Sequence, residues 1–258
     1  MEFFDSHSHY NDEKFNLDRE KIIEDTYKDG ITRFVCAGYD LTSSKLSIEI
    51  ANKYEYIYSV CGISPNDVPE NINDIDTQIK EIEKIVKENK KVVAIGEIGL
   101  DYYWNNENKE IQKEMFIKQI ELANKYDLPI VIHTREAVDD TLKILRENKV
   151  KCTGIFHCCP LNRELVKQAL ALGFYISFSG VITFKNAKNA EEIVNMVPND
   201  KILIETDSPY LSPEPKRGSR NDSRNVKYIA AKIASFKNIG IEEVAKMTYK
   251  NANTIFKI

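Results

Sequence analysis

Short apolar runs alternate with longer amphipathic stretches along the whole chain. Eight of these runs are rich in Ile, Val and Phe and show little polar alternation: 2–9, 31–38, 57–64, 92–99, 129–134, 152–158, 174–180 and 202–208. Strands that are buried on both faces have this composition, because neither face of the sheet meets water. We therefore predict eight strands in a parallel sheet.

Helical periodicity fills the intervals between the predicted strands. In the stretch 76–89, Ile79, Ile82 and Val86 recur on one helical face. Gly173 stands at a natural C-cap position, where a helix over 162–173 would end. Further helices are predicted at 108–127, at 189–197 and in a helical tail from Asn225 to the end of the chain.

This alternation predicts an α/β fold, a (β/α)₈ TIM-type barrel, with a single domain over residues 1–258. The usual size of such a barrel, about 250 residues, leaves no need for a second domain. An open doubly wound sheet is the alternative fold. It would usually carry a glycine-rich phosphate loop after a strand, and the sequence has no such motif.

Composition and charge narrow the class of protein. The net charge of -4 argues against a broad basic surface for nucleic acid, although it leaves room for a local basic groove. No run approaches the roughly 20 apolar residues that span a bilayer, and no secretory signal is visible.

The five cysteines are odd in number and form no C-x-x-C motif. Reduced thiols and a cytoplasmic location are therefore expected.

Candidate ligands for metal ions fall at the carboxyl ends of the predicted strands, where a barrel enzyme carries its site. They are His7, His9, Glu97, His133, His157 and Asp207, and they include every histidine of the chain. A single histidine there would be an ordinary core residue, but four at one end of a barrel predict a metal site. Side chains alternate along a strand, so His7 and His9 point to the same side and can bind one ion.

The number of candidate ligands favours two divalent ions over one. Six ligands exceed the four that a tetrahedral zinc ion requires, so we expect two ions that share a carboxylate. Two ions about 3.5–4 Å apart can bind both the attacking and the leaving oxygen of a phosphate ester. Their charge outweighs that of two carboxylates and favours an anionic substrate. Zinc, manganese and magnesium are candidates, and histidine ligands favour the first two.

Six segments together resemble the TatD family of metal-dependent deoxyribonucleases, which are amidohydrolase-type barrels. They are "DSHSHYND", "GEIGLDYY", "VIHTREA", "FHCCP", "GFYISFSGVITFKNA" and "IETDSPYLSPEPKRGSRND", in the family's order and over essentially the whole chain. The resemblance implies that one ion is held by His7, His9 and Asp207, that the other is held by His133 and His157, and that Glu97 bridges them.

The resemblance also suggests roles around the ions. Glu97 and Asp207 are the implied catalytic residues, with Asp207 orienting or deprotonating the attacking water. Glu205 lies one layer below Asp207, and Asp5 stands in the same relation to His7. Both carboxylates are expected to support the ligands by hydrogen bonds, or to be structural residues of the barrel wall.

Several residues are candidates for binding the substrate. Arg135 shares a face with His133, and its guanidinium can bind a phosphate in a bidentate way. The basic segment 215–227 follows the last strand and would form a basic lip, with Lys216 and Arg217 as the best candidates.

Two departures from the family pattern affect substrate binding. The family often has G-x-H-P-H after the third strand, whereas this chain has Ser64 and Asn66 in "GISPND". The family usually has P-H-R-G after the last strand, whereas this chain has "PKRG", in which Lys216 replaces the histidine. Asn66 is therefore a candidate substrate ligand. The aromatic run 102–104 is expected either to stack on a base or to pack within its loop.

The function expected from these observations is a divalent-metal-dependent phosphodiester hydrolase acting on DNA. The resemblance implies a 3′-to-5′ exodeoxyribonuclease that prefers single strands, uses a metal-activated water as nucleophile, and serves DNA repair or DNA catabolism. No membrane and no obligate protein partner are expected. The alternative is an ester or amide hydrolase on the same site, such as a D-aminoacyl-tRNA deacylase or a lactonase. A structural metal-binding protein is a third hypothesis, which the lack of cysteine ligands disfavours.

Overall fold

Eight parallel strands follow one another in chain order around a nearly closed barrel. The strands are β1 (Phe3–Ser8), β2 (Ile31–Ala37), β3 (Ile57–Cys61), β4 (Val92–Asp101), β5 (Ile130–Arg135), β6 (Gly154–Phe156), β7 (Tyr175–Phe178) and β8 (Ile202–Ile204). They are taken from a computed structural model, in which residues 1–104 and 106–258 are described. The predicted barrel is confirmed, and the open doubly wound sheet is not formed.

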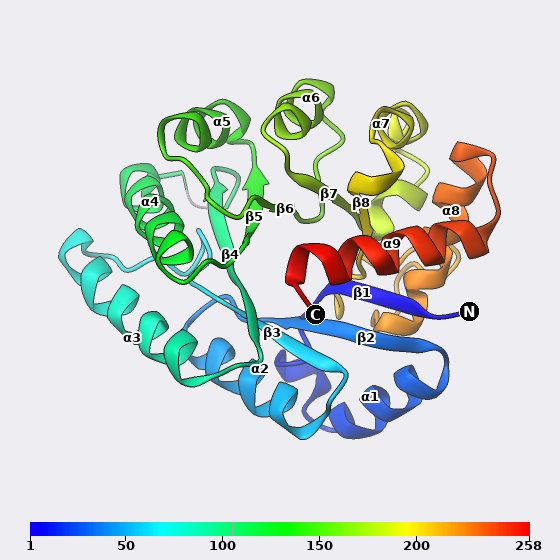
Figure 1. Cartoon of the computed structure of the whole chain (residues 1–258), viewed down its shortest axis with the longest axis horizontal. Coiled ribbons are helices and arrows are strands. Elements are labelled where there is room, and N and C mark those ends of the chain that lie inside the picture. The colour runs from blue at the N-terminus through cyan, green and yellow to red at the C-terminus, as the bar shows by residue number, and fades with distance from the viewer. Residues whose placement is uncertain (105) are drawn as a thin grey trace.

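Helices cover the outside of the barrel (Figure 1). They are α1 (Arg19–Lys28), α2 (Leu41–Lys53), α3 (Ile75–Glu88), α4 (Lys109–Lys125), α5 (Val138–Glu147), α6 (Arg163–Ala171), α7 (Ala190–Met196), α8 (Val226–Lys237) and α9 (Ile241–Phe256). Short 3-10 helices occupy Glu13–Phe15, Ile72–Asp74, Gly180–Thr183, Asn199–Lys201 and Ser223–Asn225. Within the described ranges, no helix is both long and apolar enough to cross a lipid bilayer.

The structure corrects several predicted boundaries. The helical tail is two helices, because Asn238 adopts a left-handed conformation with φ of 52° that ends α8. Strand β4 continues to Asp101, two residues beyond its predicted end. Strands β6 and β8 are shorter than predicted, so His157 and Asp207 lie on the segments that follow them. Gly173, at φ of 87°, does take the predicted position after α6.

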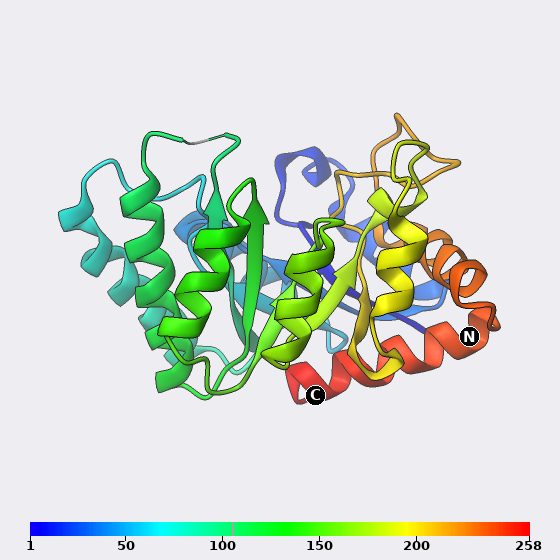
Figure 2. The ribbon, with the colours of Figure 1, turned by 90° about the horizontal axis from the view of Figure 1, so that it is seen from above.

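The core has two layers, one inside the barrel and one between the barrel and its helices. Inside, a cluster of small and medium apolar side chains from the strands includes Val35, Val131 and Leu203. Helix α9 packs against one end of this cluster. There the ring of Phe256 stacks on that of Phe4, with 6.0 Å between the ring centroids. Figure 2 shows α9 and both termini at one end of the barrel, opposite the loops that follow the strands. The loop end is therefore the end available for a site.

The barrel closes where the first strand meets the segment after the last. An isolated parallel bridge links Ser8, the last residue of β1, to Ser208 on the segment after β8. The Asp207 amide donates to the His7 carbonyl at 3.0 Å, and the His9 amide donates to the Ser208 carbonyl at 2.7 Å. These bonds bring the two ends of the sheet together at its carboxyl edge.

The packing of α4 against the barrel supplies a test of the fold. Phe116 is fully buried in the layer between helices and strands. We predict that Phe116→Ala lowers the free energy of unfolding by about 3–5 kcal/mol, because it leaves a cavity in a close-packed core. The matched control is Glu121→Ala on the exposed side of the same helix, where the change should stay within about 0.5 kcal/mol. Equal effects of the two changes in chemical denaturation would contradict this packing.

Candidate metal centre

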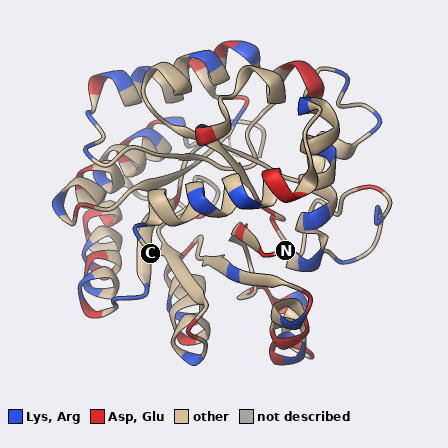
Figure 3. Ribbon diagram, turned by 45° about the vertical axis from the view of Figure 1, so that its right-hand side comes forward, with Lys and Arg blue, Asp and Glu red and all other residues tan. Residues whose placement is uncertain are grey.

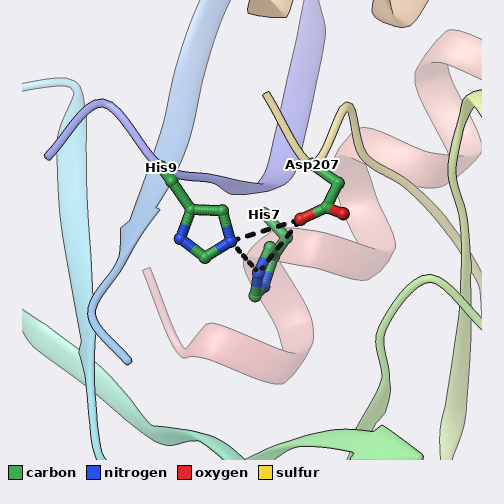
Figure 4. A group of neighbouring side chains, drawn as sticks. All are labelled: His7, His9 and Asp207. Carbon is green, nitrogen blue, oxygen red and sulfur yellow. Dashed lines mark hydrogen bonds and ion pairs between the residues drawn. The ribbon is translucent and has the colours of Figure 1, made fainter. Parts of the chain in front are cut away.

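Two histidines and an aspartate converge at the closure of the barrel (Figure 4). The Nε2 atoms of His7 and His9 lie 3.2 Å apart. The Asp207 Oδ1 atom lies 3.2 Å from His9 Nε2 and 3.8 Å from His7 Nε2. The alternation of side chains along β1 places both imidazoles on one side, as predicted, and the backbone bonds of the closure bring the carboxylate to them. These three side chains form one cluster of candidate metal ligands.

A second pair of histidines lies across the site on β5 and on the segment after β6. His133 Nδ1 and His157 Nε2 are 3.3 Å apart. Both nitrogens face one carboxylate oxygen, Glu97 Oε1, at 2.9 and 3.0 Å. Glu97, His133 and His157 form a second cluster of candidate ligands.

Glu97 stands between the two pairs of histidines. Its Oε1 atom contacts the second pair, while its Oε2 atom lies 3.6 Å from His7 Nε2 and 3.7 Å from His9 Nε2. In each pair, two imidazole nitrogens converge to about hydrogen-bond distance. A shared cation suits both nitrogens of a pair better than one proton does, and imidazole nitrogen with carboxylate oxygen is a donor set for divalent metals. The residues therefore fit metal ions as a group.

The charges of the site favour a cation as well. Burial raises the pKa of Glu97, but the neighbouring imidazoles of His157 and His133 lower it well below its usual range. Burial likewise lowers the pKa of His157, yet Glu97 and Glu205 raise it well above the usual value. The pKa of His9 is raised to about 9, because Asp207 and Glu97 outweigh the effect of its burial. Ionised carboxylates thus surround the imidazoles and attract positive charge.

Asp101 belongs to this site although the sequence analysis did not select it. Its side chain is buried at the end of β4, and its Oδ2 atom lies 2.9 Å from His133 Nε2. The contact leaves His133 Nδ1 facing Glu97 and fixes the orientation of the ring. The sequence pattern that points to Asp101 is the alternation of side chains along a strand, which places it on the same side as Glu97. The prediction omits it because the predicted strand ends at residue 99.

Glu205 and Asp5, the two carboxylates predicted to support the ligands, make different contacts. The Glu205 Oε1 atom is 3.4 Å from His157 Nδ1 and accepts a hydrogen bond from the Cys158 amide at 2.6 Å. Asp5 accepts from the Thr206 amide at 2.9 Å and from the Thr206 hydroxyl, and so joins β1 to the closing segment. Burial raises the pKa of Asp5 to about 7. Glu205 therefore faces a candidate ligand directly, whereas Asp5 holds the backbone that carries His7.

A pocket of about 790 Å³ opens above the cluster. Its lining includes Arg135 and Asn66, two of the four predicted substrate ligands, and also Ser64. Lys216 and Arg217 are not among the described residues that line it. Arg217 instead donates to the Ser212 carbonyl and lies over the Phe184 ring.

Most of the other basic residues of 215–227 carry acidic partners. Arg220 pairs with Asp18, Arg224 with Asp222, and Lys227 with Asp29. The segment is consequently much less basic in the structure than in the sequence.

In the aromatic run after β4, the structure shows packing for one residue and exposure for two. Tyr102 packs partly against the core and donates its hydroxyl to Asp140 at 2.6 Å. Tyr103 and Trp104 remain exposed, and Trp104 lines the pocket. Cys158 also lines the pocket, but burial raises the pKa of its thiol well above the usual value.

Comparison with known proteins shows the family to which this chain is related. The family model described as TatD related DNase matches residues 4–257. The metal-dependent hydrolase YabD of Bacillus subtilis (strain 168) is 41% identical over 256 residues, which cover 99% of each chain. The metal-dependent hydrolase YcfH of Escherichia coli (strain K12) is 46% identical over 167 residues, 64% of this chain and 63% of that protein.

Solved structures show the same fold. The TatD homologue YjjV from Escherichia coli superposes with a TM-score of 0.93 at 24% identity, over 99% of this chain and 98% of that chain. An amidohydrolase from Saccharomyces cerevisiae superposes with a TM-score of 0.89 at 18% identity, over 99% of each chain. The architecture of β strands and covering helices is therefore shared beyond the range of close sequence similarity.

The contacts of Asp101 supply a test of the site's construction. We predict that Asp101→Ala lowers the free energy of unfolding by about 2–3 kcal/mol, because it leaves buried donors without an acceptor. Trp104, the only tryptophan of the chain, should also gain mobility, since its amide donates to Asp101 Oδ1 at 3.0 Å. Denaturation and fluorescence anisotropy measure the two effects. Asp200→Ala, at an exposed position, is the control, and identical anisotropy in both variants would refute the anchoring role.

Proposed function

The chain belongs to the TatD-related DNase family of metal-dependent hydrolases, and from this premise we propose that it hydrolyses phosphodiester bonds of DNA. One observation carries the proposal. The two oxygens of Glu97 face two separate pairs of histidines, beneath a pocket that also holds the guanidinium of Arg135. A two-ion site next to a phosphate-binding cation suits a phosphodiester substrate.

We infer from the two clusters of side chains which residues would hold each proposed ion. One ion would be held by His7, His9 and Asp207, the other by His133 and His157, with Glu97 between them. Divalent ions at such a site polarise a phosphoryl oxygen and lower the pKa of a bound water. Behind the ligands, Asp101 would hold the tautomer of His133 that presents Nδ1, and Glu205 would hold His157 so that it presents Nε2.

Arg135 would bind and orient the phosphate. Its guanidinium lies over the Tyr103 ring, 3.8 Å from the ring centre. Contact with the ring restricts the position of the guanidinium, whose N–H groups can donate hydrogen bonds to a phosphate. Two parallel bonds to non-bridging phosphate oxygens would hold the scissile group still and stabilise the charge that develops on it.

Asp207 would orient the attacking water and accept its proton. Burial raises the pKa of this carboxyl, but the imidazole of His9 lowers it, so that it stays below the usual value. The carboxylate is therefore ionised at neutral pH and able to accept a hydrogen bond from water. Its backbone is fixed by the closure of the barrel, which keeps the carboxylate beside the histidines.

The proposed activity includes a preferred form of DNA, a direction of digestion and a cellular role. We infer 3′-to-5′ digestion of single strands, with a role in DNA repair or DNA catabolism in the cytoplasm. The family resemblance supports the direction of digestion. Acidic and basic residues are interspersed along the helices in the view of Figure 3, whereas a long duplex is bound best by a broad basic face. Substrate contacts would then concentrate in the pocket, at Arg135 and Asn66.

A single assay tests the reaction and its substrate together. Metal-stripped protein is reloaded separately with zinc, manganese and magnesium, and is offered single-stranded DNA labelled at either end, duplex DNA and D-aminoacyl-tRNA. We predict cleavage of the single strand from its 3′ end. Glu97→Gln, which keeps the shape but removes the charge, should lower the rate at least about 100-fold.

The control for this variant is Glu147→Gln, at an exposed position on α5, which should cleave at the wild-type rate. Absence of DNA cleavage with all three metals would overturn the proposal, as would full activity of Glu97→Gln. Hydrolysis of D-aminoacyl-tRNA alone would favour the alternative ester-hydrolase function.

A further inference from the structure

The only tryptophan of the chain lies on the wall of the pocket with its ring largely in water. Trp104 is 69% exposed. It lines the same pocket as Glu97, His133 and Arg135. A large aromatic ring is stabilised when it is buried, so this exposed ring is available to a ligand that covers it.

The backbone of Trp104 is tied to the candidate metal centre. The amides of Tyr103 and Trp104 both donate to Asp101 Oδ1 at 3.0 Å. The other oxygen of the same carboxylate contacts His133 at 2.9 Å. One buried carboxylate thus contacts both a candidate metal ligand and the backbone of the aromatic residue, which ties Trp104 to the candidate metal centre.

A cation and two aromatic rings stand next to each other on this wall. The guanidinium of Arg135 lies 3.8 Å from the centre of the Tyr103 ring and 5.5 Å from that of Trp104. The rings of Tyr103 and Trp104 meet edge to face at 4.8 Å. A phosphate-binding group beside an open aromatic face is the combination by which proteins hold single-stranded nucleic acid.

The aromatic residues of the opposite wall are less available. The Tyr210 hydroxyl donates to Asp12 at 2.6 Å, and Lys14 Nζ lies 4.1 Å above the Tyr210 ring. Tyr39 is half-buried, with its ring 5.7 Å from that of His9. Trp104 therefore offers the most accessible ring among the described residues that line the pocket.

We propose that Trp104 is the base-stacking surface of a nucleotide subsite, in which Arg135 holds the phosphate of the same nucleotide. This inference rests on the proposed function and adds the source of its preference for single strands. In a duplex the terminal base is held by pairing and by stacking on one neighbour, whereas an unpaired terminal base can leave its stack and lie on the indole. Stacking does not depend on base identity, so the subsite accepts all four bases.

Kinetics on matched strands test the subsite. One strand is an ordinary oligonucleotide, and the other lacks bases at the nucleotides of the digested end. Trp104→Ala should raise KM for the ordinary strand by roughly 5- to 100-fold and leave cleavage of the abasic end unchanged. Trp104→Phe should recover most of the loss. Tyr27→Ala, at an exposed tyrosine outside the pocket lining, should match the wild type on both strands.

The outcomes separate this inference from the proposed function. Equal effects of Trp104→Ala on the two strands, or no effect on either, would overturn the stacking role while DNA cleavage itself persists. Failure of the wild type to cleave any strand would instead refute the proposed function.

Binding measured without cleavage gives an independent readout. In zinc-loaded protein, thymidine 5′-monophosphate should quench the fluorescence of Trp104, and 2-deoxyribose 5-phosphate, which lacks the base, should not. Because the chain has a single tryptophan, emission excited at the red edge of indole absorption, where tyrosine does not absorb, reports this residue. Equal quenching by both compounds, or quenching by neither, would contradict a base on the indole.

Discussion

The closure of the barrel is the constraint on which the candidate site depends. Two backbone hydrogen bonds, from the Asp207 amide to the His7 carbonyl and from the His9 amide to the Ser208 carbonyl, join the first strand to the segment after the last. Asp207 adopts a left-handed backbone with φ of 54° at this point. Such a conformation costs about 1–2 kcal/mol in a non-glycine residue. The closing bonds offset that cost and place a carboxylate beside imidazoles that lie about 200 positions earlier in the chain.

The opposite half of the site depends on a close approach between β4 and β5. Gly99 has φ of 137°, and a Cβ atom at this position would lie 2.0 Å from the His133 carbonyl oxygen. Only glycine allows the strands to meet in this way. The contact lets β4 carry Glu97 on one side of His133 and Asp101 on the other. The buried carboxylates and imidazoles then stabilise one another's charge. Removal of either partner would leave the other buried without a compensating charge.

Sequence reasoning recovered the parts of this arrangement that follow from periodicity. Continuous apolar runs predicted the parallel strands, and the alternation of side chains along a strand predicted that His7 and His9 share a side. Asp101 was missed because β4 continues past the glycine that a sequence pattern treats as its end. The basic segment 215–227 was overestimated, because sequence shows its cations but not the acidic partners that lie far away in the chain. Arg220, for example, meets Asp18 only after folding.

We propose that Glu97 lies between two separate metal positions, and the metal content of the purified protein tests this proposal. After stripping and reloading with zinc or manganese, elemental analysis should give two ions per chain for the wild type. The His9→Ala and His133→Ala variants, each of which loses a ligand from a different pair, should retain one ion each. A single ion per wild-type chain would contradict the account, as would the loss of all metal from either variant.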